Sequence, residues 1–188
     1  MTATGLEAFV LIGGFSERMG EDKASLRIGG ERMAERVAAA LRAHAVSVRF
    51  VGKHRPEWID VADFVSDGTE EKHALHGVRA AMEAACGSWV LIAPCDLAGL
   101  LETHVGTLLD SVGPVIATGA AGDQPLLARL PTSWLSRVRS WIVEGAPARR
   151  LGDEAEAIPL PDSALRNINL PVDLDRFVRA GDGERTEE

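Results

Sequence analysis

The segment AFVLIGGFSERMGEDK, residues 8–23, decides both the fold class and the place to look for a functional site. Residues 8–12 form a continuous apolar run, which is typical of a strand buried on both faces of a sheet. A loop rich in glycine and charge follows at once. Because ligands of open α/β sheets bind beyond the carboxyl ends of the strands, this loop is the first candidate for a binding site.

The rest of the chain alternates between helical and strand patterns. Apolar residues at helical spacing predict a helix over residues 31–44, and a β-rich run predicts a strand over residues 46–51. We expect further strands at 61–65, 89–93, 115–118, 126–130 and 157–160, and further helices at 74–85, 100–109, 132–143 and 171–180. This alternation predicts an α/β fold with a mainly parallel sheet and helices on both faces.

Length and composition predict one globular domain. The chain has 188 residues, of which 46% are hydrophobic, so we expect a single domain over residues 1–180 and a frayed polar tail over residues 181–188. No run of 18 or more apolar residues occurs, and the beginning lacks the pattern of a signal peptide, which favours a cytoplasmic protein. Cys86 and Cys95 lie among apolar neighbours, and we expect both to be buried, reduced thiols.

The charge distribution favours a small anionic ligand. A net charge of −8 argues against binding to nucleic acid or to an acidic membrane surface, because both need a broad basic face. Arg18, Lys23 and Arg27 nevertheless place three cations in one short segment. Backbone N–H groups around the glycines would bind phosphate oxygens while Arg18 and Lys23 neutralise them, as a triphosphate requires.

Two familiar phosphate-binding motifs do not fit this loop. The spacing of Gly13, Gly14 and Gly20 matches neither the P-loop nor the dinucleotide-binding fingerprint. An ordinary surface loop with scattered charges is the alternative, and the buried strand before the loop argues against it.

The loop does resemble a known signature. Residues 11–23 are similar to Leu-Ala-Gly-Gly-x-Ser-x-Arg-Met-Gly-x-Asp-Lys of the molybdenum cofactor guanylyltransferases, with Ile12 where that family has Ala. Three further blocks follow in the family's order: residues 74–77 resemble its Pro-Leu-Ala-Gly segment, residues 94–96 match its Pro-Cys-Asp metal motif, and residues 167–174 resemble Asn-Ile-Asn-Thr-Pro-Glu-Asp-Leu.

The resemblance implies a three-layer, Rossmann-like nucleotidyltransferase fold and a Mg²⁺-dependent transfer of GMP from GTP to molybdopterin, with release of pyrophosphate. It also implies roles for residues of this chain. Asp96 would hold the Mg²⁺ and Lys23 would contact the nucleotide phosphates. The expected nucleotide-binding residues are Leu11, Ile12, Gly13, Gly14, Lys23, Asp67 and Asp96, and Asn167 and Asn169 are expected on the acceptor side.

Simpler interpretations stand beside these roles. Asp96 follows a buried strand and a proline, a suitable place for a hard oxygen ligand, but it would also serve as the N-cap of the next helix. Asp67 precedes a glycine and is equally typical of a turn. Asn167 and Asn169 precede a proline, where capping and turn residues are common.

The expected mechanism is in-line attack by a molybdopterin phosphate oxygen on the α-phosphorus of GTP, with Lys23 and Arg18 stabilising the leaving pyrophosphate. Two alternatives stay open: a related transferase that uses CTP or another phosphorylated acceptor, and a non-catalytic nucleotide-binding module. His73 and His76 lack a third metal ligand at suitable spacing, so we expect partly exposed helix residues there. The expected partners are the two small substrates and molybdoenzyme-maturation proteins, and the expected assembly is a monomer or a weak homo-oligomer.

Overall fold

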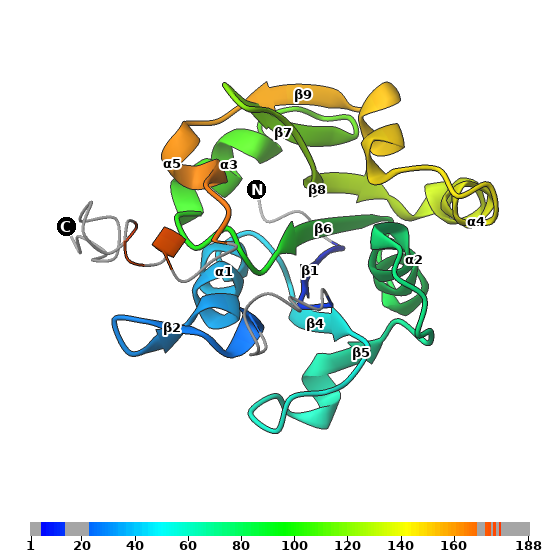
Figure 1. The fold of residues 1–188 in the computed structure, drawn as a ribbon. Coiled ribbons are helices and arrows are strands. Elements are labelled where there is room, and N and C mark those ends of the chain that lie inside the picture. The colour runs from blue at the N-terminus through cyan, green and yellow to red at the C-terminus, as the bar shows by residue number, and fades with distance from the viewer. Residues whose placement is uncertain (1–4, 14–22, 169–171, 174, 176, 178–188) are drawn as a thin grey trace.

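The structure, a computed structural model, describes residues 5–13, 23–168, 172, 173, 175 and 177 (Figure 1). In this part of the chain a seven-stranded sheet contains β1 (Leu6–Leu11), β4 (Val48–Gly52), β5 (Phe64–Ser66), β6 (Trp89–Pro94), β7 (Val115–Gly119), β8 (Gly122–Pro131) and β9 (Glu156–Pro159). The α-helices are α1 (Met33–Arg42), α2 (Ala74–Ala84), α3 (Glu102–Leu109), α4 (Leu135–Val143) and α5 (Asp162–Leu165). Shorter elements are the hairpin of β2 (Arg27–Ile28) and β3 (Glu31–Arg32), and the 3₁₀ turns η1 (Lys23–Ser25), η2 (Val61–Asp63), η3 (Thr132–Trp134) and η4 (Ala148–Asp153).

The sheet has the strand order β5-β4-β1-β6-β8-β7-β9. All neighbouring pairs are parallel except those of β8, which runs antiparallel to both β6 and β7. The expectation of a mainly parallel sheet is therefore confirmed. The antiparallel strand arises because β7 returns through a tight hairpin in which Gly119 pairs with Gly122, and Gly122 adopts a φ of 108°, which favours glycine.

Helices cover both faces of the sheet. Along β1, Ala8 and Val10 pack in the cluster that includes α1 and α3, while Phe9 and Leu11 pack in the cluster that includes α2 and α4. In Figure 1, α1 and α3 lie on one side of the sheet and α2 and α4 on the other. Because alternate side chains of a strand point to opposite faces, a strand buried on both faces carries apolar side chains at consecutive positions, which explains the run at residues 8–12.

Several boundaries differ from the sequence expectation. Of the strand expected at residues 61–65, the first part is the 3₁₀ turn η2 and only the end belongs to β5. The hairpin of β2 and β3, the turn η4 and helix α5 were not expected. The helix expected at residues 171–180 and the tail at residues 181–188 lie mainly outside the described residues.

One burial expectation is wrong. Cys95 is buried, but Cys86 is exposed, because α2 ends at Ala84 and the chain turns at the surface before β6. Both are free cysteines. None of the helices in the described ranges has the length and apolar character that a membrane crossing needs.

Candidate functional site

A pocket of about 460 Å³ opens at the carboxyl ends of β1, β4, β5 and β6. Its lining residues include Leu11, Ile12 and Gly13 after β1, Asp67 after β5 and Asp96 after β6. β1 lies between β4 and β6 in the sheet, so the loops that follow these strands converge at one edge. The sequence predicted a site at the ends of the first strand and of residues 89–93, and the structure places described residues from both regions, Gly13 and Lys23 from the first and Asp96 from the second, in this pocket.

The central charged pair of the pocket is Lys23 and Asp96. Lys23 Nζ lies 3.9 Å from Asp96 Oδ2, and the two side chains are 16% and 21% exposed. Burial raises the pKa of the Asp96 carboxyl, and the nearby Lys23 ammonium and a backbone hydrogen bond lower it by less. Oδ1 of Asp96 is buried and has no hydrogen-bond partner in the part of the chain that the structure describes. The carboxylate is thus only partly compensated and is suited to a further cation.

Asp96 is not a helix cap. Helix α3 begins at Glu102 and its N-cap is Leu101, so the capping interpretation of Asp96 is excluded. The Asp96 backbone is instead tied to its surroundings, since its carbonyl accepts a hydrogen bond from the Ile168 N–H at 3.0 Å. The half-buried Asn167 directly precedes Ile168 in the sequence, so this bond also brings Asn167 close to Asp96 in space. Asn169 lies outside the described residues.

Lys23 is held by its own turn. It opens the 3₁₀ turn η1, and its carbonyl accepts a hydrogen bond from the Leu26 N–H at 3.2 Å. Ala24 is fully buried, and Ser25 Oγ accepts a hydrogen bond of 2.8 Å from Trp58 Nε1. The backbone that carries Lys23 is therefore fixed against the core beneath it.

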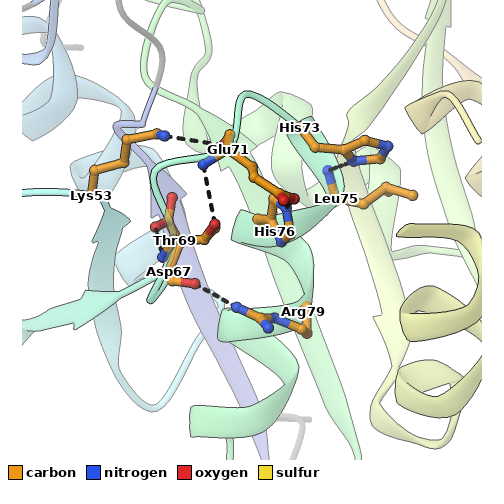
Figure 2. A network of polar contacts seen from close by, with 8 residues as sticks. All are labelled: Lys53, Asp67, Thr69, Glu71, His73, Leu75, His76 and Arg79. Carbon is orange, nitrogen blue, oxygen red and sulfur yellow. Dashed lines mark hydrogen bonds and ion pairs between the residues drawn. The ribbon is translucent and has the colours of Figure 1, made fainter. Parts of the chain in front are cut away.

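Asp67 lies in a turn and also lines the pocket. It is 6% exposed, its N–H donates to the Gly52 carbonyl at 3.0 Å, and its Oδ1 accepts from the Thr69 N–H at 3.2 Å (Figure 2). Gly68 follows with a φ of 70°, so a turn is present. A Cβ added to Gly13 would lie 3.6 Å from Asp67 Oδ2, which shows that the carboxylate also faces the end of β1.

Glycines bring the walls of the pocket together. A Cβ added to Gly77, near the start of α2, would lie 3.2 Å from Leu11 Cδ2. A Cβ added to Gly52 would lie 2.9 Å from Ile12 Cγ1. The small residues at these two positions allow α2 and β4 to approach the end of β1, where a ligand would sit.

One wall of the pocket was not expected. The residues involved follow β4 and β5 and precede α2: Lys53, His54, Glu70, Glu71, Lys72 and His73. The rule that drew attention to the loops after residues 8–12 and 89–93 would also have selected Lys53 and His54, which follow the strand expected at residues 46–51. Glu70, Glu71 and Lys72 carried no comparable signal, because their place depends on how β5 and α2 pack.

The expectation for the two histidines is partly wrong. His76 is buried, with 5% exposure, and does not lie partly exposed on its helix. His73 caps α2, since its Nδ1 accepts a hydrogen bond from the Leu75 N–H at 3.2 Å. Among the described residues no group of three or more His, Cys, Asp or Glu side chains is arranged to hold a metal ion. A Mg²⁺ bound by one carboxylate together with substrate phosphates does not need such a group.

The predicted site residues fall into three groups. Asn167 is described but is not among the residues that line the pocket. Leu11, Ile12, Gly13, Lys23, Asp67 and Asp96 all line the pocket. Gly14, Arg18 and Asn169 lie outside the described residues.

Comparison with known proteins identifies the family. The model of the MobA-like NTP transferase domain matches residues 8–158, from β1 into β9. The chain belongs to the MobA-like NTP transferase family. As a MobA-like NTP transferase, the protein is a nucleotidyltransferase. The matched region includes Lys23, Asp67 and Asp96 and ends before Asn167.

Relatives of this MobA-like protein match along nearly their whole length. A protein of Opitutus terrae named "Probable molybdenum cofactor guanylyltransferase" is 27% identical over 192 residues, covering 93% of this chain and 95% of that one. The molybdenum cofactor guanylyltransferase of Yersinia pestis is 24% identical over 189 residues, covering 93% and 96%. Molybdopterin-guanine dinucleotide biosynthesis protein A from Archaeoglobus fulgidus has the same fold, with a TM-score of 0.74 at 18% identity over 95% of this chain and 100% of that one.

Proposed function

We propose that the protein transfers the guanylyl group of GTP to the terminal phosphate of molybdopterin, releasing pyrophosphate. The single observation that carries the proposal is the partly compensated Asp96 carboxylate, 3.9 Å from the Lys23 ammonium in a pocket at the strand ends. A carboxylate beside an ammonium group suits a substrate whose phosphates carry a bound metal ion. The guanylyltransferase names of full-length relatives support the choice of GTP and molybdopterin.

The residues present fit a Mg²⁺ ion. Asp96 offers a hard oxygen ligand whose Oδ1 is buried and has no hydrogen bond to the described residues. Its raised pKa indicates a carboxylate that a further positive charge would stabilise. When bound there with substrate phosphates, Mg²⁺ would neutralise charge on the reacting phosphoryl groups.

The protein's own residues would position the two substrates and neutralise the charge of their phosphates. The acceptor phosphate oxygen is already anionic, so no general base is needed. The rate acceleration would come from alignment of the substrates and stabilisation of charge. Lys23 would stabilise the pyrophosphate that leaves, together with Arg18, which the structure does not describe. Leu11, Gly13 and Asp67 would shape the nucleotide side, and Asn167 would lie toward the acceptor.

Calorimetric titration tests the proposal. GTP, CTP, ATP and UTP would each be titrated with and without Mg²⁺ into the wild type, Asp96→Ala and Asp110→Ala. Asp110 is an exposed carboxylate at the C-terminus of α3 and provides the same chemical change away from the pocket.

We expect selective, Mg²⁺-dependent GTP binding that is lost or becomes Mg²⁺-independent in Asp96→Ala and persists in Asp110→Ala. A preference for CTP would replace the guanylyl proposal by a cytidylyl one. GTP binding without pyrophosphate release in the presence of molybdopterin would favour a non-catalytic binding module.

A further inference from the structure

The segment 67–73, which forms one wall of the pocket, is held by a series of hydrogen bonds that meet at Glu71 (Figure 2). Lys53 Nζ, from the end of β4, donates to the Glu71 carbonyl at 3.0 Å. The Glu71 N–H donates to Thr69 Oγ1 at 3.1 Å, and the Thr69 N–H donates to Asp67 Oδ1 at 3.2 Å. The position of Glu71 is therefore linked to that of Asp67 through the turn between them.

His76 binds the side chain of the same glutamate from α2. His76 Nε2 lies 3.2 Å from Glu71 Oε2, and the two side chains are 7% and 78% exposed. An ionised carboxylate only accepts hydrogen bonds, so Nε2 carries the hydrogen in this contact. The other ring nitrogen, Nδ1, is buried and has no hydrogen bond within the described ranges.

Burying a polar ring with one unsatisfied nitrogen opposes folding. His76 stands between Leu75 and Gly77, which line or support the pocket wall, at the position where the resembled signature has a small alanine. The Glu71 carboxylate is the polar partner of the His76 ring in the described part of the chain, and it belongs to the pocket wall. The contact thus connects a buried helix residue directly to the binding surface.

We infer that His76 is a positioning residue, which holds Glu71 and with it the segment 67–73 in place against the nucleotide, and so sets nucleotide affinity without taking part in the chemical step. This inference rests on the proposed function for the identity of the ligand. Asp67 and Lys72 of the segment line the pocket, so movement of Glu71 would displace groups that face the ligand.

Four single variants and the His76→Ala/Glu71→Ala double variant separate this role from a general loss of packing. His76→Ala and Glu71→Ala each remove the contact, while His76→Gln keeps an N–H donor on a long side chain. Glu70→Ala removes the neighbouring carboxylate, which lies 3.8 Å from the exposed His54, and leaves the Glu71–His76 contact intact. Amide hydrogen exchange of residues 68–73, the Kd for GTP with Mg²⁺, and kcat for pyrophosphate release at saturating GTP would be measured for each.

We expect His76→Ala and Glu71→Ala to speed exchange of residues 68–73 and to raise the Kd about threefold to tenfold, the range for one net hydrogen bond, with kcat changed less than about twofold. His76→Gln should restore most of the affinity, Glu70→Ala should keep the exchange protection, and the double variant should be no worse than either single variant. Unchanged exchange in His76→Ala, or additive effects in the double variant, would overturn the inference. Absence of any nucleotide binding by the wild type would instead refute the proposed function, and the exchange measurement would still decide whether His76 holds the segment.

Discussion

The Lys23 ammonium lies 3.9 Å from Asp96 Oδ2, yet the pKa of the Asp96 carboxyl is raised. The two facts agree because the loss of hydration on burial destabilises the charged carboxylate by more than the attraction of one ammonium at this distance stabilises it. The protein therefore maintains an ionisable group whose charged form is under-stabilised in the described structure. Such an arrangement is typical of a functional site and leads to the first prediction.

Asp96→Asn should be more stable than the wild type near neutral pH. A folded pKa above the unfolded value of 3.8 means that the contribution of Asp96 to stability is fully present below that value and is lost as the pH rises through the raised folded pKa. The stability difference between Asp96→Asn and wild type should thus grow with pH across this window. Thermal midpoints of both proteins from about pH 4 to about pH 8 measure it. Asp110→Asn, on the surface, is the control, and parallel curves for Asp96→Asn and wild type would show that Asp96 is not destabilised by burial.

Lys23→Met should have a far larger effect on turnover than loss of another cation in the same pocket. Removing the charge that stabilises leaving pyrophosphate should lower kcat by on the order of 10² to 10³, as loss of a preorganised electrostatic group does. Lys53→Met removes a pocket cation bound to the Glu71 carbonyl, so it should mainly raise the Kd. Pyrophosphate release at saturating GTP compares the two. Equal losses of kcat would mean that the pocket needs only net positive charge and that Lys23 has no special role.

Gly77→Ala should weaken nucleotide binding without the stability gain that alanine usually gives in a helix. Its Cβ would lie 3.2 Å from Leu11 Cδ2 and push that side chain into the pocket, so the Kd should rise about tenfold, the lower end of the effect of one methylene. Gly106→Ala is the matched control in α3, because its Cβ would meet His44 Cε1 at an ordinary 3.5 Å. It should stabilise the fold by about 0.5–1 kcal/mol and leave the Kd unchanged. Urea unfolding and calorimetry measure both quantities, and equal effects of the two variants would refute the role of the close approach.

The bond between Trp58 Nε1 and Ser25 Oγ should stabilise the turn that carries Lys23. Trp58 packs edge-on against Phe50 with ring centroids 5.6 Å apart, and the Arg32 guanidinium lies 4.9 Å from its ring. A double-mutant cycle of Trp58→Phe and Ser25→Ala separates the hydrogen bond from this packing. We expect a coupling free energy of about 0.5–1.5 kcal/mol in urea unfolding. Strict additivity would show that the contact does not stabilise the turn.

Local patterns were enough to locate the centre of the site. The apolar run that became β1 is followed by a loop rich in glycine and charge, and the run that became β6 is followed closely by Asp96. Parallel strands place their carboxyl ends at one edge. The loops after these strands could therefore be selected as the site, while the assignment of Lys23 and Asp96 to it rested on the resemblance of residues 11–23 and 94–96 to the family's motifs. The predicted fold class holds for the same reason, because strands buried on both faces leave an unbroken apolar signal.

Features that depend on distant packing could not be predicted in this way. A polar residue such as His76 is expected at the surface of a helix, yet His76 is buried. Its partner Glu71 lies in a loop, where no periodic pattern predicts which residues it contacts. Glu7 interrupts the apolar start of β1, yet it is buried, 2.9 Å from Arg49 Nη2, and accepts hydrogen bonds from the Cys86 and Gly87 N–H groups. Only the folded structure shows which charges are satisfied by residues far along the chain.

The most direct test of the account is product analysis after the purified protein is incubated with molybdopterin, Mg²⁺ and GTP. Mass spectrometry and a pyrophosphate assay would be run in parallel on the wild type and Asp96→Ala. We predict molybdopterin guanine dinucleotide and pyrophosphate in equal amounts from the wild type, and neither from Asp96→Ala. No dinucleotide from GTP, with product formed only when CTP or another acceptor is supplied, would contradict the account.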